Sequence, residues 1–368
     1  MKYVPIGILL SLFALLVSSC SFQNNSKTGS SLLIDLSNPK ENLPISSFID
    51  DIETIKFEVP EPYFFGIITK VLFTDSTFFV VDKKQGYVYR FRQDGTFLNQ
   101  VGSKGEAPGE YRALHRFFLG KQSVFISDIG MRKIHCYTHS GGYIQTISAT
   151  HTSVYDDIIA LPNGKFLCHD IQGRKGESKI WLMNEKGEEE KTLIYHDASY
   201  PYSSTNWSTI INTSSDDSFK VFDPITGVFY LYEVKKEDKL VEMQHLVSDR
   251  KALAAYKGMD NLMDIRDDYA YLSYIADANR YLYTMWYTSD SMALCSLYEK
   301  DTMESTVFYL PKIDFPGYPV CPIPIATNLP NVLVTVLTDE YPLEYFPKQY
   351  RDSISERVAI MYLMNFKK

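Results

Sequence analysis

Five aspartates recur along the chain, and each closes an apolar run of the kind that forms β-strands. They are Asp82, Asp128, Asp170, Asp223 and Asp277, at spacings of 46, 42, 53 and 54 residues. Carboxylates can ligate calcium or act as general acids, but at a strand end they also accept backbone N–H groups from the turn. Because five repeats carry the residue and a catalytic group is needed only once, we favour the turn role.

Pairs of adjacent aspartates offer further carboxylates. The pairs are Asp50-Asp51, Asp156-Asp157, Asp216-Asp217 and Asp267-Asp268. Calcium takes about six to eight oxygen ligands, so loops of this kind could build a calcium site at the mouth of a ring of strands. The leading interpretation assigns no cofactor, no metal ligand and no catalytic residue, and a calcium-assisted lyase or hydrolase is the alternative.

The seven histidines form no pair at metal-ligand spacing. His135 and His139 are four residues apart, which on a strand separates them by about 13 Å. His115, next to Arg116, is a candidate to face a central channel, and its plainer role is that of a loop histidine bonded to backbone. His169 has the same two interpretations. The chain has no HExxH, GxSxG or Walker motif, so the sequence leans away from enzymatic activity.

Four cysteines beyond the N-terminal region lie too far apart to form a CxxC metal or redox pair. They are Cys136, Cys168, Cys295 and Cys321. Cys136 and Cys168 sit inside apolar runs. We favour buried free thiols over a disulfide, which an exported protein could also form.

Apolar runs rich in β-branched and aromatic residues must position these groups. Examples are residues 77–82, 123–128, 179–184, 227–234 and 280–287, each bounded by turn residues. A strand ending in an acidic residue, a polar turn, a second strand and a further turn form a unit of about 40 to 50 residues, which is typical of a β-propeller. Five such repeats and the strands expected at 320–338 and 358–366 predict an all-β, six-bladed β-propeller.

The two ends of the chain predict how the ring of blades closes. An open blade edge would expose unpaired N–H and C=O groups to other chains, and closure removes this liability. Apolar runs occur at 32–36 and 52–59 near the start and at 358–366 near the finish. We therefore predict that N- and C-terminal strands share one blade, with 52–59 or 32–36 beside strands from 320–366.

The N-terminus has the layout of an export signal. Lys2 precedes an apolar run at 6–17, and small residues then lead to Cys20. The segment resembles the bacterial lipobox, in which the cysteine is acylated and becomes the first mature residue. An ordinary signal peptide with a chance cysteine nearby is the alternative.

These features divide the chain into three predicted parts. The segment 21–31 carries one charge and one aromatic residue, too little apolar surface to fold by itself. The parts are a lipoprotein signal peptide at 1–19, a flexible tether at 20–31 and a single propeller domain at 32–368.

The loop GSKGEAPGEY at 102–111 carries a more specific signal. With the preceding IKFEVP and FLNQVG, it resembles the six-bladed, NHL-like propeller lipoproteins in the envelopes of some Gram-negative bacteria, where a G-x-x-G-x-G-P-G-E-Y loop joins the first two blades. Ala107 departs from this pattern, which has Gly at that position. Loop residues and the two that follow are our binding candidates: Gly105, Pro108, Gly109, Glu110, Tyr111, His115 and Arg116.

The resemblance implies a binding platform, although related six-bladed folds include calcium-dependent lactonases and lyases. We therefore predict a lipid-anchored propeller that binds a protein, peptide or glycan at its channel mouth. Aromatic stretches at 60–66 and 199–207 could serve such ligands, with blade packing as the alternative. The net charge of −8 argues against nucleic acid as a partner. Residues 21–25 lack the acidic cluster that the resemblance links to surface export, which predicts an outer-membrane lipoprotein of the cell envelope facing the periplasm.

Overall fold

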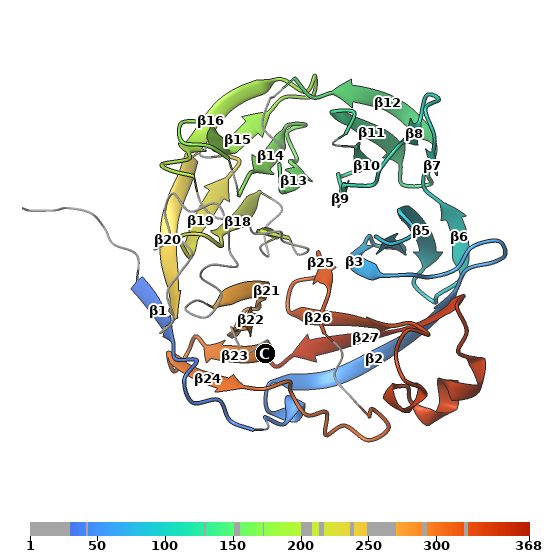
Figure 1. Ribbon diagram of the computed structural model, residues 1–368, viewed down its shortest axis with the longest axis vertical. Helices are drawn as coiled ribbons and strands as arrows, with labels where there is room; N and C mark the ends of the chain where they lie inside the picture. Colours follow the sequence, from blue (N-terminus) through green and yellow to red (C-terminus); the bar gives the residue numbers. More distant parts are fainter. Residues whose placement is uncertain are drawn as a thin grey trace, which may run out of the picture.

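The protein is a ring of six sheets around a central axis, as the computed structural model shows (Figure 1). Each sheet is one blade, and its strands follow one another from the centre of the ring outward. The all-β, six-bladed propeller predicted from the repeats is therefore confirmed. The structure describes residues 30–41, 43–128, 130–150, 155–171, 173–199, 208–212, 217–235, 239–248, 270–288, 293–319 and 323–368.

Each of the first three blades has four antiparallel strands in chain order, and blade 1 gains a fifth strand from the C-terminal part of the chain. Blade 1 contains β3 (Ile68–Phe73), β4 (Thr77–Asp82), β5 (Tyr87–Arg92) and β6 (Phe97–Gln100). Blade 2 contains β9 (Arg116–Leu119), β10 (Ser123–Asp128), β11 (Lys133–Thr138) and β12 (Tyr143–Ser148). Blade 3 contains β13 (Asp157–Ala160), β14 (Phe166–His169), β15 (Ser178–Met183) and β16 (Glu189–Tyr195). Between blades 1 and 2, β7 (Ser103–Lys104) and β8 (Glu110–Tyr111) form a short parallel pair.

Blades 4 and 5 continue the ring. Blade 4 contains β17 (Ile210–Asn212), β18 (Ser218–Asp223), β19 (Val228–Glu233) and β20 (Lys239–Ser248). Blade 5 contains β21 (Tyr271–Asp277), β22 (Tyr281–Tyr287), β23 (Ala293–Glu299) and β24 (Glu304–Phe308). None of the helices in the described ranges is long and apolar enough to cross a membrane.

Blade 6 closes the ring with strands from both ends of the chain. Its order is β26 (Val332–Leu337), β27 (Val358–Phe366) and β2 (Ile49–Glu58), with β27 antiparallel to both neighbours. The short β25 (Ala326–Thr327) joins β3 of blade 1 in parallel. The predicted closure, with residues 52–59 beside C-terminal strands, is therefore confirmed.

The other N-terminal run, at 32–36, takes a different place. The strand β1 (Ser30–Ile34) begins inside the segment predicted as a tether and adds to blade 4 as its outermost strand, parallel to β20. The chain then bridges to Phe308 of blade 5 through Lys40 before it reaches η1 (Ile45–Ser47) and β2 in blade 6. The N-terminal segment is therefore a strap across three blades.

The repeated aspartates mark one kind of hairpin. Asp82, Asp128 and Asp223 each end a strand and pair with the first residue of the next strand, and Asp277 ends β21 and pairs with Leu282, the second residue of β22. In blades 1, 2 and 4 these are the second and third strands, whereas in blade 5 they are the first two described strands. Asp170 lies directly after β14.

The hydrophobic core is divided among the six boundaries between blades. Both sides of a blade are covered, so its central strands can be apolar throughout, which explains the aromatic-rich composition. Strand β27 shows this alternation. Ile360 and Tyr362 belong to a cluster with blade 5, whereas Met361 and Leu363 face a cluster with blade 1. Outside blade 6, η4 (Leu343–Tyr345) and η5 (Lys348–Ser353) link β26 to β27.

Cys136, Cys168 and Cys295 are buried free thiols, as predicted. Burial raises the pKa of all three, that of Cys295 to about 12, so these thiols stay protonated and unreactive. Cys321 and the predicted lipidation site Cys20 lie outside the described residues.

Candidate functional site

The hairpin aspartates have structural partners. Asp82 accepts the N–H groups of Gly66 at 2.6 Å and Gln85 at 2.9 Å. Asp128 accepts that of Arg112 at 2.6 Å, and Asp223 accepts that of Ile225 at 3.0 Å. These three carboxylates fix turns, which confirms the structural role predicted for them.

The loop at 102–111 is held by its own residues. The carboxylate of Glu110 accepts the N–H of Ala107 at 2.9 Å, so its charge is used to fix the turn. A Cβ on Gly105 would lie 1.9 Å from that carboxylate, which explains the glycine. Gly109, at φ 83°, offers its carbonyl to the hydroxyl of Tyr137. Pro108 is exposed.

Tyr111 anchors this loop between blades 1 and 2. Its ring is buried in the cluster shared by the two blades, and its hydroxyl donates to the carbonyl of Gly86 at 3.1 Å. Five of the seven binding candidates, from Gly105 to Tyr111, therefore build a clasp between blades. The two that follow, His115 and Arg116, lie elsewhere, at the inner end of blade 2.

His115 and Arg116 meet groups from blades 1 and 3. The ammonium of Lys83 donates to the carbonyls of Leu114 at 3.1 Å and His115 at 3.4 Å. The guanidinium Nε of Arg116 donates to the carbonyl of Asp156. Lys70 of strand β3 in blade 1 is close enough to Arg116 for the two charges to interact. We call Lys70, Lys83, His115, Arg116 and Asp156 the inner cluster.

Burial shifts the titration of the inner cluster. It lowers the pKa of His115 to about 3, with the neighbouring cations adding to the effect, so this imidazole is neutral. It also lowers the pKa of Lys70 and Lys83. The pKa of Asp156 rises to about 6 for the same reason, although its carboxylate accepts the N–H of Ile171 at 2.7 Å. Groups with such shifts are concentrated at functional sites.

Two members of the cluster keep unused hydrogen-bonding capacity. Among the described residues, none accepts a hydrogen bond from the ammonium of Lys70, and none bonds Nδ1 of His115. The adjacent Asp157 accepts the N–H groups of Ile158 at 3.0 Å and Ile210 at 2.9 Å, and its negative charge also attracts the ammonium of Lys70. The cluster therefore holds a cation and an imidazole whose hydrogen-bonding capacity the described residues leave unused.

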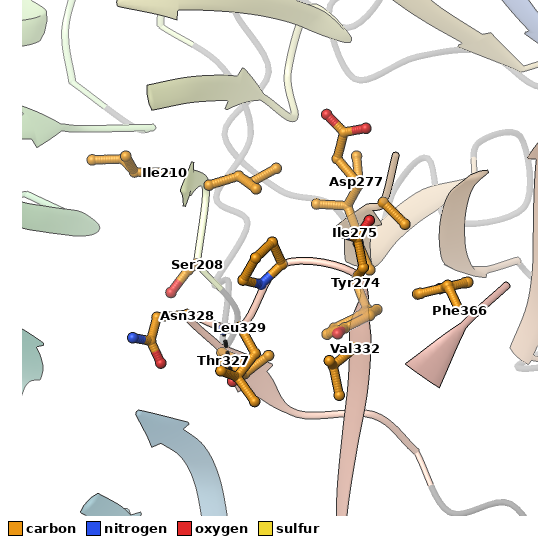
Figure 2. A pocket seen from close by; sticks show the side chains of 16 residues that line it. Ser208, Ile210, Tyr274, Ile275, Asp277, Thr327, Asn328, Leu329, Val332 and Phe366 are labelled. Atoms are coloured by element: carbon orange, nitrogen blue, oxygen red, sulfur yellow. Dashed lines mark hydrogen bonds between the residues drawn. The ribbon is translucent and has the colours of Figure 1, made fainter. Parts of the chain in front are cut away.

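Figure 2 shows a small hollow between blades 4, 5 and 6. Its walls are mainly apolar, with Ile210, Ile275 and Phe366 among them, and Asp277 is its charged residue. The cavity has a volume of about 50 Å³. That volume admits only about four water molecules, so the hollow is too small for a peptide or a sugar.

The remaining predicted candidates contribute little to a site. Asp50 and Asp51 lie exposed on the outer strand β2. No group of three or more metal-ligating side chains gathers within the described part of the chain. In the stretch 60–66, Phe65 packs on Phe57 at 5.3 Å between ring centroids, while Phe64 is exposed.

Other predicted groups fall partly outside the described residues. These are Asp216, the pair Asp267-Asp268 and residues 200–207 of the second aromatic stretch. His169 is a buried core residue, whose Nδ1 contacts the hydroxyl of Thr209 at 2.7 Å.

Sequence reasoning missed the two lysines of the inner cluster. Lys70 stands in the run ITKVLF, and a single lysine inside an apolar strand of a two-sided sheet is an anomaly that could have drawn attention to it. Lys83 follows the marker Asp82 directly and looked like an ordinary turn residue. Only the ring brings both of them to Arg116.

The fold and the inner cluster define a six-bladed β-propeller with charged groups at its centre. The chain belongs to the family described as Domain of unknown function (DUF4934), which matches residues 32–360. A comparison with curated proteins finds no match.

Solved structures share the fold at low sequence identity. A putative exported protein from Bacteroides fragilis is similar over 92% of this chain and 100% of its own, with a TM-score of 0.72 and 16% identity. A member of the duf4221 family from Bacteroides vulgatus is similar over 87% of this chain and 98% of its own, with a TM-score of 0.56 and 8% identity. These likenesses show the fold alone.

Proposed function

We propose that this protein is a lipid-anchored propeller of the cell envelope that binds a peptide, protein segment or glycan with an acidic group at the inner cluster. The observation that carries the proposal is Lys70. Its side chain is half-buried, its charge interacts with those of Asp157 and Arg116, and no described residue accepts a hydrogen bond from its ammonium. A cation held in this way is costly to the fold alone and gains energy when an anionic group arrives.

The surrounding groups suit recognition better than chemistry. Neutral His115 can donate or accept one hydrogen bond at its free Nδ1. Asp156, with a pKa of about 6, can be protonated near neutral pH and then donate to a ligand oxygen. Charged and polar donors of this kind fix the orientation of a polar ligand.

Attachment to the envelope rests on the N-terminal sequence. The lipobox-like residues up to Cys20 support it, and one similar structure is a putative exported protein. The position on the outer membrane facing the periplasm, and the NHL-like ancestry, are part of the same proposal. Protease shaving of intact cells tests the orientation, because efficient digestion would mean that the propeller faces outward.

A binding screen tests the function. Purified protein is exposed to arrays of acidic and neutral peptides and glycans, and hits are measured again with Lys70→Met. We expect Lys70→Met to weaken binding of an acidic ligand at least tenfold, since a hydrogen bond to a charged group is lost. Lys56→Met, at an exposed position of the outer strand β2, is the matched control and should bind as the wild type does. Ligands that bind both variants equally well would refute the site.

The calcium-assisted lyase or hydrolase gains no support from the described residues, where metal-ligating side chains do not gather. Metal analysis of the purified protein tests it directly. One calcium per chain, retained through gel filtration, would favour the enzyme over the binding platform.

A further inference from the structure

A second pocket lies at the boundary between blades 4 and 5, away from the inner cluster. It has a volume of about 260 Å³ and is lined by strands of both blades and by Leu32 of the N-terminal strap. Pockets that hold drug-sized ligands measure about 300–1,000 Å³, so this one suits a smaller molecule.

The charged side of the pocket carries a net positive charge. Lys220 of blade 4 and Lys300 of blade 5 both bind the carboxylate of Asp277, Lys300 at 2.6 Å from Oδ1 and Lys220 through Oδ2. The ammonium of Lys300 also donates to the carbonyl of Ala278 and keeps one further N–H group. Two positive charges thus share one negative charge among the described residues. The lysine side chains are 25% and 33% exposed, so the ion cluster can be reached from solvent.

The equivalent hairpin aspartate at the previous boundary shows what a balanced arrangement looks like. Asp223 pairs with one lysine, Lys179, and takes a further hydrogen bond from Thr226 at 2.6 Å. That pair is almost completely buried. At Asp223 one lysine is enough to connect the two blades. The second lysine at Asp277 adds a positive charge that a structural contact does not require.

The rest of the pocket is mainly apolar, with Gln244 and Tyr298 as its other polar residues. Phe229 and Leu282 form buried walls, and Met243 and Met303 stand at the exposed side. Exposed methionines are adaptable and are common at surfaces that accept varied apolar ligands.

Met303 stands out by its exposure, since its side chain is 76% exposed. Its backbone has φ 60°, as Arg132 and Asn331 have 52° and 62°, and all three lie directly before a strand, so the turn sets this conformation. The exposed side chain is what makes Met303 available to a ligand at the pocket rim.

We propose that the blade 4–5 pocket binds a small amphipathic carboxylate, an aliphatic chain that ends in one carboxyl group. The carboxylate bonds the free N–H groups of Lys220 and Lys300 and supplies the missing negative charge. The aliphatic chain lies between Phe229, Leu282 and the two methionines.

Octanoate is the probe. Its binding to the full chain in lipid nanodiscs is measured by calorimetry, and empty nanodiscs serve as the blank. We expect saturable binding of one octanoate per chain. Hexanoate should bind roughly fifteenfold more weakly, because each buried methylene changes the affinity about fourfold. Octanol and octylamine should bind at least tenfold more weakly, since neither supplies the negative charge. Equal binding of octanol or octylamine would overturn the proposal, as would a lack of saturation.

The variants Lys220→Met and Lys300→Met should each lower the affinity for octanoate at least tenfold. Lys56→Met, far away on β2, should leave this affinity unchanged. If the lysine variants fail to fold, Met243→Glu tests the site instead, because Met243 takes part in no ion pair of the pocket. Its new carboxylate should repel octanoate and weaken binding. Wild-type affinity in Met243→Glu would overturn the proposal. Unchanged binding in Lys70→Met shows that this pocket is independent of the inner cluster.

Discussion

Closure of the ring by β27 can be tested with one substitution, Met361→Ala. Met361 lies in the middle of β27, pairs with Ile55 of β2 and Val336 of β26, and is fully buried. Its side chain fills the cluster between blades 6 and 1, which also contains Phe57. Truncation of a buried methionine to alanine leaves a cavity and costs about 2–5 kcal/mol.

The free-energy cost of Met361→Ala is a large part of the free energy of unfolding of the protein. Domains unfold with a free energy of about 5–15 kcal/mol, so Met361→Ala should still fold but with clearly reduced stability. Deletion of residues 358–368 removes seven or more buried side chains worth about 1.5–3 kcal/mol each, and we expect the truncated chain not to fold at all.

Urea unfolding and hydrogen exchange provide the assay. Glu53→Ala, at an exposed position of β2 opposite Leu363, is the control and should change the free energy of unfolding by less than about 0.5 kcal/mol. If the ring is one cooperative unit, Met361→Ala should also speed exchange of amides in β15, on the opposite side of the ring (Figure 1). A loss below about 1 kcal/mol, or faster exchange confined to blade 6, would refute the argument that β27 holds the ring together.

Three further outcomes are expected. Gly95 and Gly164 share nearly the same φ, 88° and 85°, but a Cβ on Gly95 would lie 2.0 Å from the carbonyl of Lys56 while Gly164 has open space, so Gly95→Ala should cost about 1–3 kcal/mol more in urea unfolding; equal costs would contradict this. Burial lowers the pKa of His169 from 6.5 to about 4, so its contribution to stability is present above pH 6.5 and is lost as the pH falls. Between pH 8 and pH 5 the wild type should lose about 2 kcal/mol more than His169→Gln, and parallel losses would show that His169 does not titrate in this way. Replacement of Cys20 by Ser should release the protein from the membrane fraction, and a variant that stays bound and is processed like the wild type would disprove lipidation.

The repeat could be read before the structure because it is local. A strand, an aspartate that caps its end, and a turn recur within each unit, and each unit must place apolar residues on both faces to pack against its neighbours. The same reasoning predicted that Ile52 to Val59 would meet the C-terminal strands, because an unpaired edge is costly. It did not predict that Ser30–Ile34 would join blade 4, since an apolar run fits the edge of any blade equally well.

The clasp at 102–111 shows the limit of a motif. The sequence singled out Glu110 and Tyr111 as candidate binding residues. In the structure the carboxylate of Glu110 accepts the N–H of Ala107, and the hydroxyl of Tyr111 donates to the carbonyl of Gly86, so both groups bond within the protein. A motif records that residues are constrained, and it does not say whether a ligand or a neighbouring blade imposes the constraint.

The fold class, the blade count and the pairing that closes the ring could be predicted from the amino-acid sequence, because they depend on periodicity along the chain and on the need to pair strand edges. Which charged side chains meet could be learned only from the arrangement of the blades in space. Lys70 and Arg116 come from different blades, as do Lys220 and Lys300, and nothing in their spacing marks them. Desolvation and Coulomb interactions act over a few ångströms in space, so the chemistry of both sites exists only once the blades stand side by side.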